Sequence, residues 1–96
     1  MMDEEIIQLI NRRRRQVLIH SIIYYRFDEN IISDAMWTKW AMELADLQRK
    51  YPEESGQCVY SEAFADFDGS TGFNLPLEDE WAVAKALWLL ERRKWK

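Results

Sequence analysis

The sequence predicts a small all-α domain with two long N-terminal helices in a helix–turn–helix hairpin, a short middle helix and a tryptophan-rich C-terminal helix. Glycine and proline are scarce, with three and two residues, and all of them lie between residues 52 and 76. The segments on either side therefore lack helix breakers. In both segments apolar residues recur at steps of three and four, as on one face of a helix. Ninety-six residues are the size of one small domain, so we expect residues 1–96 to fold as a single unit.

The first helix is expected over residues 3–27. Acidic residues at positions 3–5 suit the positive, N-terminal end of a helix dipole. Residues 17–23 are rich in β-branched side chains and could also form a strand. No turn signal separates them from the arginines at 12–15, which favours one continuous helix. The expected apolar stripe comprises Ile6, Ile10, Val17 and Tyr24, widened by Leu9, Leu18, Ile22 and Tyr25.

The second helix should start near Ser33 or Asp34, because either residue type favours the N-cap position. It should end at Tyr51, because Pro52 disfavours helical geometry in the residue before it. Its apolar positions follow at steps of three, four and three residues: Trp37, Trp40, Leu44 and Leu47.

Residues 54–76 are expected to form a short helix and a loop. Tyr60, Phe64 and Phe67 fit a helix of about two turns. The stretch DGSTGFNLP that follows indicates a loop, because Gly69 and Gly72 can take positive φ angles.

The last helix is expected over residues 77–95, starting near Pro76 or Leu77. Trp81, Trp88 and Trp95 lie seven residues apart, on one side of that helix. We expect Trp81 and Trp88 to be core and Trp95 to be exposed; a partner-binding stripe or a dimer seam is the alternative. The other positions expected on the buried side are Leu77, Val83, Ala84, Leu87 and Leu90.

Composition and charge exclude several classes of function. A net charge of −4 argues against nucleic-acid binding, because binding a polyanion usually needs a positive excess. A single cysteine, Cys58, excludes an internal disulfide and a multi-cysteine zinc site, and one histidine, His20, makes any metal site improbable. No apolar run approaches the roughly 18 residues that span a bilayer, and the start MMDEE is unlike a secretory signal. We therefore expect a cytoplasmic protein with no metal and no membrane contact.

Four consecutive arginines at 12–15 suggest a basic patch at first sight. On a helix, however, four consecutive side chains point in four directions. The apolar stripe has a gap between Ile10 and Val17, so Arg13 or Arg14 should face inward or line a cleft, where a guanidinium needs a carboxylate or phosphate partner. The alternative is a solvated basic turn paired with the many acidic residues.

The remaining reactive side chains give weaker signals. His20 fits a partly buried imidazole or a general base, but no nucleophile stands in a recognisable relation to it. Cys58 is more readily an incidental thiol than a catalytic one. The stretch DFDGSTG, residues 66–72, lacks the lysine of a P-loop and the ligand spacing of an EF-hand, so a turn is the better interpretation.

One stretch carries a family resemblance. Five residues fall without a gap on the pattern Y-[YH]-x-x-D-x-P-x-I-x-D: Tyr24, Tyr25, Asp28, Ile32 and Asp34. Further matches in the second helix and at its end are Glu43, Leu44, Leu47, Tyr51, Pro52 and Glu53. With these residues the segment 18–53 resembles the N-terminal Ia domain of bacterial NAD-dependent DNA ligases. The family letters that differ are replaced by Asn30 for proline, Trp37 for tyrosine, Thr38 for aspartate and Trp40 for leucine.

The resemblance implies a ligand. In those ligases the Ia domain closes over NAD and holds its nicotinamide mononucleotide half, with an aromatic ring stacked on the nicotinamide. By resemblance, Tyr24, Tyr25 and Asp34 are the carried-over contacts. Trp37 is a changed contact, and Thr38 offers a hydroxyl where the family has a carboxylate. The candidate ligand-binding residues are therefore Tyr24, Tyr25, Asp34, Trp37 and Thr38, together with Arg13 and Arg14 from the gap in the stripe.

Several motifs and domains of the ligases are missing from this sequence, and their absence limits its expected function. The sequence contains no K-x-D-G nucleotidyl-transfer motif and no four-cysteine zinc finger, and it is too short for an adenylation domain. We therefore expect no enzymatic activity. The expected function is a stand-alone Ia-like module that binds a nicotinamide nucleotide or completes a partner's site. The alternative is a small acidic protein of phage type that binds and modulates or inhibits a host protein, with a homodimer also possible.

Overall fold

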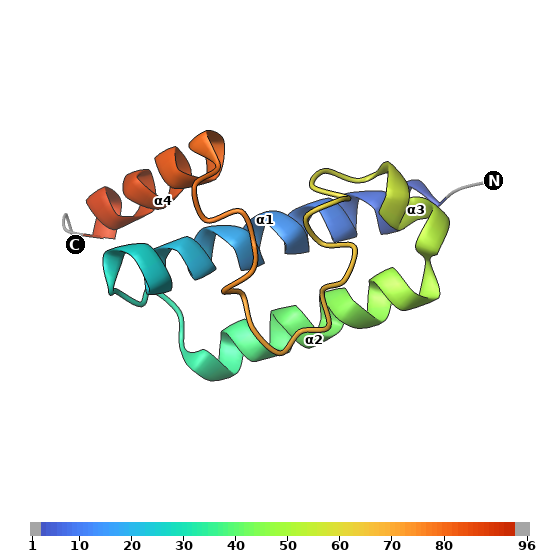
Figure 1. Cartoon of the computed structure of the whole chain (residues 1–96), viewed down its shortest axis with the longest axis horizontal. Helices are drawn as coiled ribbons and strands as arrows, with labels where there is room; N and C mark the ends of the chain where they lie inside the picture. The colour runs from blue at the N-terminus through green and yellow to red at the C-terminus, as the bar shows by residue number, and fades with distance from the viewer. Residues whose placement is uncertain (1–2, 94–96) are drawn as a thin grey trace.

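The structure, a computed structural model, describes residues 3–93. This part of the chain is all helical, with four helices and no strand: α1 Glu4–Phe27, α2 Asp34–Lys50, α3 Pro52–Gln57 and α4 Glu80–Arg93 (Figure 1). The all-α prediction with two long N-terminal helices is confirmed. α1 runs along the long axis with α2 on one side and α4 on the other (Figure 1), and within the described helices α4 contacts only α1.

The central position of α1 explains its composition. Val17, Leu18 and Ile22 are fully buried although they point in different directions, because helices pack on two sides of α1. The β-branched run that could also have formed a strand is therefore a helix buried on more than one face. The Asp3 carboxylate caps the helix by accepting from the backbone N–H groups of Glu5 and Ile6, at 2.9 and 3.4 Å. α1 ends at Phe27, and its C-cap residue Asp28 adopts the left-handed backbone conformation at φ 50°.

α2 begins where the sequence indicates. Ser33 is the N-cap, and its Oγ accepts a hydrogen bond from the N–H of Met36 at 3.1 Å. Asp34 is the first helical residue, so the cap is the serine rather than the aspartate. α2 ends at Lys50, and Tyr51 and Pro52 lead directly into α3.

The predicted position of the middle helix is wrong. The sequence pattern placed it over residues 60–67, whereas α3 spans Pro52–Gln57 and residues 59–66 form turns. Tyr60 has φ 58°, which a continuing right-handed helix excludes. Proline at the first helical position followed by two glutamates favours a helix start at Pro52, a signal that apolar spacing does not contain.

α4 starts later than residue 76 or 77. Its cap is Asp79, whose carboxylate accepts from the N–H of Ala82 at 3.0 Å and whose carbonyl accepts from the N–H of Val83 at 2.9 Å. Residues 75–79 form turns held by their own backbone bonds.

The expected burial of Trp81 and Trp88 is also wrong. Their exposed fractions are 49% and 48%, whereas Ala82 and Ala86 are fully buried against the rest of the core. Small residues let α4 lie close to α1, and Trp81 and Trp88 point outward as a result. Of the other positions expected inside, Val83 and Leu90 are half-buried but Leu87 and Ala84 are exposed. Trp95 lies outside the described residues. No helix in the described part of the chain is long and apolar enough to cross a membrane.

Candidate functional site

A partly open cleft of about 200 Å³ lies at the end of the molecule where α1 turns into α2. Its walls come from the last turns of α1, the connection between α1 and α2, the first turns of α2 and the loop at residues 70–71. Hydroxyl groups dominate its polar lining and are supplied by Ser21, Tyr24, Tyr25, Ser33, Thr38, Ser70 and Thr71. The charged side chains that line it are both acidic, Glu29 and Asp34.

The structure brings together five of the seven predicted ligand residues. Those lining this cleft are Tyr24, Tyr25, Asp34, Trp37 and Thr38. Tyr24 and Tyr25 meet edge to face, with ring centroids 4.9 Å apart, and remain 53% and 42% exposed. Asp34 and Thr38 are one helical turn apart at the start of α2. Aromatic rings and polar groups therefore face the same space.

The floor of the cleft is a chain of hydrogen bonds between helices. Trp37 Nε1 donates to Ser21 Oγ at 3.2 Å, and Ser21 Oγ donates to the carbonyl of Val17 at 2.7 Å. Gly72 presses against the same serine, because a Cβ atom at Gly72 would lie 2.2 Å from Ser21 Oγ and 3.2 Å from the Trp37 ring. The indole of Trp37 is thus fixed from α1 and from the loop.

The loop that closes one side of the cleft is held by local and distant bonds. The Asp68 carboxylate accepts from the N–H and the hydroxyl of Ser70, at 2.9 and 2.6 Å, and these bonds lower the pKa of Asp68. Tyr25 and Thr71 share a hydrogen bond between their hydroxyls at 3.1 Å, and the Tyr25 ring also lies 5.5 Å from that of Phe73. Gly69 takes the positive φ that the sequence allows, at 87°. As expected, DFDGSTG is a turn.

His20 lines the cleft, although the sequence pattern did not single it out as a ligand contact. Its ring lies 5.6 Å from that of Trp40, and its Nδ1 is enclosed without a hydrogen-bond partner. Burial lowers the pKa of His20, so the imidazole is neutral at neutral pH. The sequence could have indicated His20 as a cleft residue, since it precedes Tyr24 by one helical turn on the same face. No sequence pattern could have indicated Ser70 and Thr71, because they lie on a loop some 45 residues further along the chain than Tyr25.

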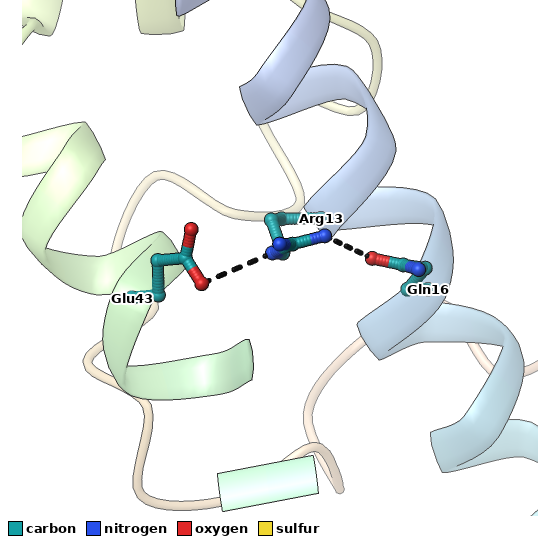
Figure 2. Close-up of polar contacts among 3 residues, drawn as sticks. All are labelled: Arg13, Gln16 and Glu43. Atoms are coloured by element: carbon teal, nitrogen blue, oxygen red, sulfur yellow. Dashed lines mark hydrogen bonds and ion pairs between the residues drawn. The ribbon is translucent and has the colours of Figure 1, made fainter. Parts of the chain in front are cut away.

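Arg13 and Arg14 lie outside the cleft. The Arg13 guanidinium bridges Glu43 on α2, with 3.2 Å between Nε and Oε2, and donates to Gln16 Oε1 at 2.7 Å (Figure 2). The sequence pattern correctly indicated an inward-facing arginine with a polar partner. The partners of Arg13 are the protein's own Glu43 and Gln16 side chains.

Arg14 is 1% exposed and donates only to neutral oxygens among the described residues. Its Nε reaches Gln48 Oε1 at 2.9 Å, and its Nη1 reaches the carbonyls of Ser55 and Val59 at 3.0 and 2.9 Å. Ser55 Oγ accepts a further bond from Nη2, and the guanidinium lies 5.6 Å from the ring centroid of Phe64. Arg14 therefore ties α1 to α2, α3 and the turn that follows. Among the described residues no group of three His, Cys, Asp or Glu side chains is placed to hold a metal ion.

Comparison with known proteins gives one distant relative. A DNA ligase of Methylococcus capsulatus (strain ATCC 33009 / NCIMB 11132 / Bath) is 31% identical over 49 residues, which is 51% of this chain. The matched segment is 7% of the ligase's own length. No family model matches the chain, and no solved structure matches it. The chain is therefore related to a DNA ligase weakly and over about half of its own length.

Proposed function

We propose that this chain is a ligase Ia-like module whose cleft binds a nicotinamide nucleotide, either NAD or nicotinamide mononucleotide, without chemistry of its own. Binding would sequester the ligand or complete the active site of a partner. The observation that carries the proposal is the convergence of Tyr24, Tyr25, Asp34, Trp37 and Thr38 on one open cleft.

The chemistry of the cleft suits an oxidised nicotinamide. A flat cationic ring is attracted to aromatic faces, which Tyr24 and Trp37 supply. The carboxylate of Asp34 favours a positive ring, and the hydroxyls of Thr38 and Ser33 can bond its amide and ribose. The volume of about 200 Å³ is below the range of about 300–1,000 Å³ that drug-sized ligands occupy. We therefore expect the base and part of its ribose to enter, with the rest of the nucleotide outside.

Two features support binding without catalysis. The sequence has no K-x-D-G motif, which supplies the lysine that carries the nucleotide in ligases. The thiol of Cys58 is buried and donates to the carbonyls of Glu54 and Ile7, and burial raises its pKa, so it is a poor nucleophile.

Calorimetric titration with nicotinamide mononucleotide and with NAD tests the proposal directly. We expect saturable binding of both, because each carries the nicotinamide ring and ribose. The Thr38→Asp variant restores the family carboxylate and should bind several-fold more tightly through the added charge. Absence of saturable heat with either ligand, in the wild type and in Thr38→Asp, would reject the pocket.

Fluorescence locates the ligand. Nicotinamide should quench the emission of Trp37, so Trp37→Phe should lose most of the ligand-dependent quenching. Trp81→Phe is the matched control, because Trp81 is exposed on α4, away from the cleft lining. Quenching that persists unchanged in Trp37→Phe would place the ligand elsewhere.

A second candidate function, an interaction protein of phage type that modulates or inhibits a host protein, is favoured by the outer face of α4. Trp81 and Trp88 are both about half exposed there. Arg15 lies over the Trp81 ring at 5.8 Å, and Lys85 and Arg92 lie over the Trp88 ring at 4.5 and 4.8 Å. Tryptophan and arginine are enriched in binding hot spots, and this face would suit an acidic surface of a partner.

A pull-down from a bacterial lysate tests this candidate. The three immobilised proteins are the wild type, a double variant with Trp81→Ser and Trp88→Ser, and Thr38→Asp. A partner from a bacterial lysate that the double variant loses and Thr38→Asp retains supports this candidate. Sedimentation of the free chain separates that result from a homodimer, which should dissociate in the double variant. Equal recovery by all three chains would reject the α4 face.

A further inference from the structure

We infer that the exposed ring of Phe73 is a second stacking platform beside the cleft, which holds the adenine of NAD and makes the chain bind this dinucleotide more tightly than nicotinamide mononucleotide. The inference rests on the proposed function, because it takes the nicotinamide ring to enter the cleft. It decides between the two ligands that the proposed function leaves open. It also adds a binding residue that lies outside residues 18–53, the segment that resembles the ligases.

Phe73 is the most exposed large apolar side chain in the described part of the chain, with an exposed fraction of 60%. The backbone on either side of it is anchored, because Gly72 lies against Ser21 and Leu75 is buried. The N–H of Phe73 donates to Thr71 Oγ1 at 3.2 Å. The N–H of Leu75 donates to the carbonyl of Gly72, also at 3.2 Å. The ring is therefore held toward solvent before any ligand arrives, which lowers the ordering cost of binding.

Phe73 continues a row of exposed aromatic rings that begins in the cleft. Tyr24 and Tyr25 line the cleft with ring centroids 4.9 Å apart, and the Tyr25 ring lies 5.5 Å from that of Phe73. An apolar side chain exposed by itself is normal on a protein surface, whereas a contiguous apolar patch is typical of a binding surface. This row of three rings therefore extends the cleft onto the loop that carries Phe73.

The size of the cleft leaves the second base of a dinucleotide outside. A volume of about 200 Å³ admits the nicotinamide and part of its ribose. The adenine of NAD must then lie near the mouth, joined to the first ribose by a diphosphate and a second ribose. The distance from the Tyr24 ring to the Phe73 ring is at most the sum of the two centroid spacings, and this linker is long enough to cross it. Phe73 gives the adenine a face on which to stack.

Charge does not decide between the two ligands. At pH 7.5 the terminal phosphate of nicotinamide mononucleotide carries about two negative charges, since the second pKa of a phosphate monoester is about 6. The diphosphate of NAD carries the same charge, and the nicotinamide ring of both ligands is cationic. The charged side chains of the cleft therefore act on both ligands to a similar extent. The difference between the two affinities reports the contact with adenosine.

Calorimetric titrations of the wild type with NAD and with nicotinamide mononucleotide, at pH 7.5, test the inference. We expect NAD to bind about tenfold more tightly, which is the contribution of one stacked base. Phe73→Leu keeps an apolar side chain beside Tyr25 but has no ring face. NAD should therefore lose most of its advantage in this variant, while the affinity for the mononucleotide stays unchanged. Phe73→Trp offers a larger face and should retain the preference. Thermal melts of both variants establish that they remain folded.

The outcomes separate the two proposals. If the wild type binds neither ligand, the proposed function fails and this inference with it. If the mononucleotide binds and NAD binds no more tightly, the function stands and the inference is overturned. A preference for NAD that persists in Phe73→Leu places the adenine elsewhere and also overturns it. If Phe73→Leu weakens both ligands equally, Phe73 supports the wall of the cleft through Tyr25 rather than holding a base, and the inference is again overturned.

Discussion

At the scale of single residues, the four consecutive arginines of α1 have separate roles because a helix turns about 100° at each residue. Arg12 and Arg15 are exposed, Arg13 reaches α2, and Arg14 is buried among neutral acceptors. Without a carboxylate beside it, Arg14 is held by the number and direction of its hydrogen bonds. The acceptors are backbone and side-chain oxygens of three segments, at Gln48, Ser55 and Val59, so the guanidinium acts as a clamp.

Replacing Arg14 by alanine should therefore destabilise the fold strongly. The substitution leaves Gln48 and the carbonyls of Ser55 and Val59 without a donor and opens a cavity above Phe64. We expect a loss of about 3 kcal/mol or more in the free energy of unfolding. Arg12→Ala is the matched control on an exposed position and should change that energy by less than about 0.5 kcal/mol. Urea denaturation measures both, and equal midpoints for the two variants would contradict the clamp.

Tyr60 gives a second residue-scale prediction, on alkaline stability. Burial, followed by the hydrogen bond to Asp79 at 2.8 Å, raises the pKa of Tyr60 from 10.0 to about 12. The folded chain thus holds the phenolic proton more tightly than the unfolded chain. The resulting stability is fully present below pH 10.0 and is lost as the pH rises toward 12.

Tyr60→Phe removes this titration. Its free energy of unfolding, measured by urea denaturation at several pH values, should fall less steeply than that of the wild type between pH 10.0 and about 12. All other side chains are common to both proteins, so only the difference between the two curves is informative. Parallel curves would show that Tyr60 does not carry the effect.

At the scale of elements, the loop of residues 68–72 determines the shape of the cleft through one close approach. Gly72 has no room for a side chain, because a Cβ would lie 2.2 Å from Ser21 Oγ and 2.9 Å from Ser21 Cβ. Gly72→Ala should push the loop from α1 and cost about 1–3 kcal/mol. The displaced loop would also break the hydrogen bond between Tyr25 and Thr71, and it would lower the affinity of the cleft for any ligand.

Gly56→Ala is the matched control for this substitution. Gly56 lies in α3, and a Cβ there would meet nothing within 4 Å. Alanine should stabilise that position by about 0.5–1 kcal/mol, since glycine loses more backbone entropy in a helix. A thermal melt that places both variants on the same side of the wild type would contradict this assignment.

The elements differ in how far their sequence determines them. Ser33 and Pro52 carry local signals that bound α2, and the structure follows them. The turns at 59–66 do not follow their apolar spacing, because Tyr60 takes a left-handed conformation and bonds to Asp79, a contact between segments that no local pattern contains. The buried face of α4 was misassigned for a related reason. The face that carries the small residues Ala82 and Ala86 packs closely on the core, and the larger Trp81 and Trp88 lie on the exposed side.

At the scale of the whole molecule, the cleft has a predictable part and an unpredictable part. The residues on α1 and α2 follow from the hairpin, because a turn between two helices brings Tyr24 and Asp34 to the same end. Ser70 and Thr71 arrive from a loop that crosses both helices (Figure 1), and only the tertiary fold places them there. His20 could have been found from its spacing to Tyr24, but its enclosed Nδ1 is a property of the packed core.

The charge of the whole chain predicts that it does not bind duplex DNA appreciably, despite its similarity to part of a DNA ligase. Nonspecific affinity for DNA comes mainly from cations that displace the counterions of phosphates. Here the net charge is −4, Arg14 is buried, and Arg13 is paired with Glu43. A mobility-shift assay with a labelled duplex at physiological salt should therefore show free DNA at micromolar protein. A Glu43→Gln variant frees Arg13 and serves as an internal check, since one released cation should still leave the duplex unbound. A tight, salt-sensitive complex with the wild type would mean that the exposed cations Arg15, Lys85 and Arg92 act together as a phosphate surface, and the net charge would then be the wrong guide to what this molecule contacts.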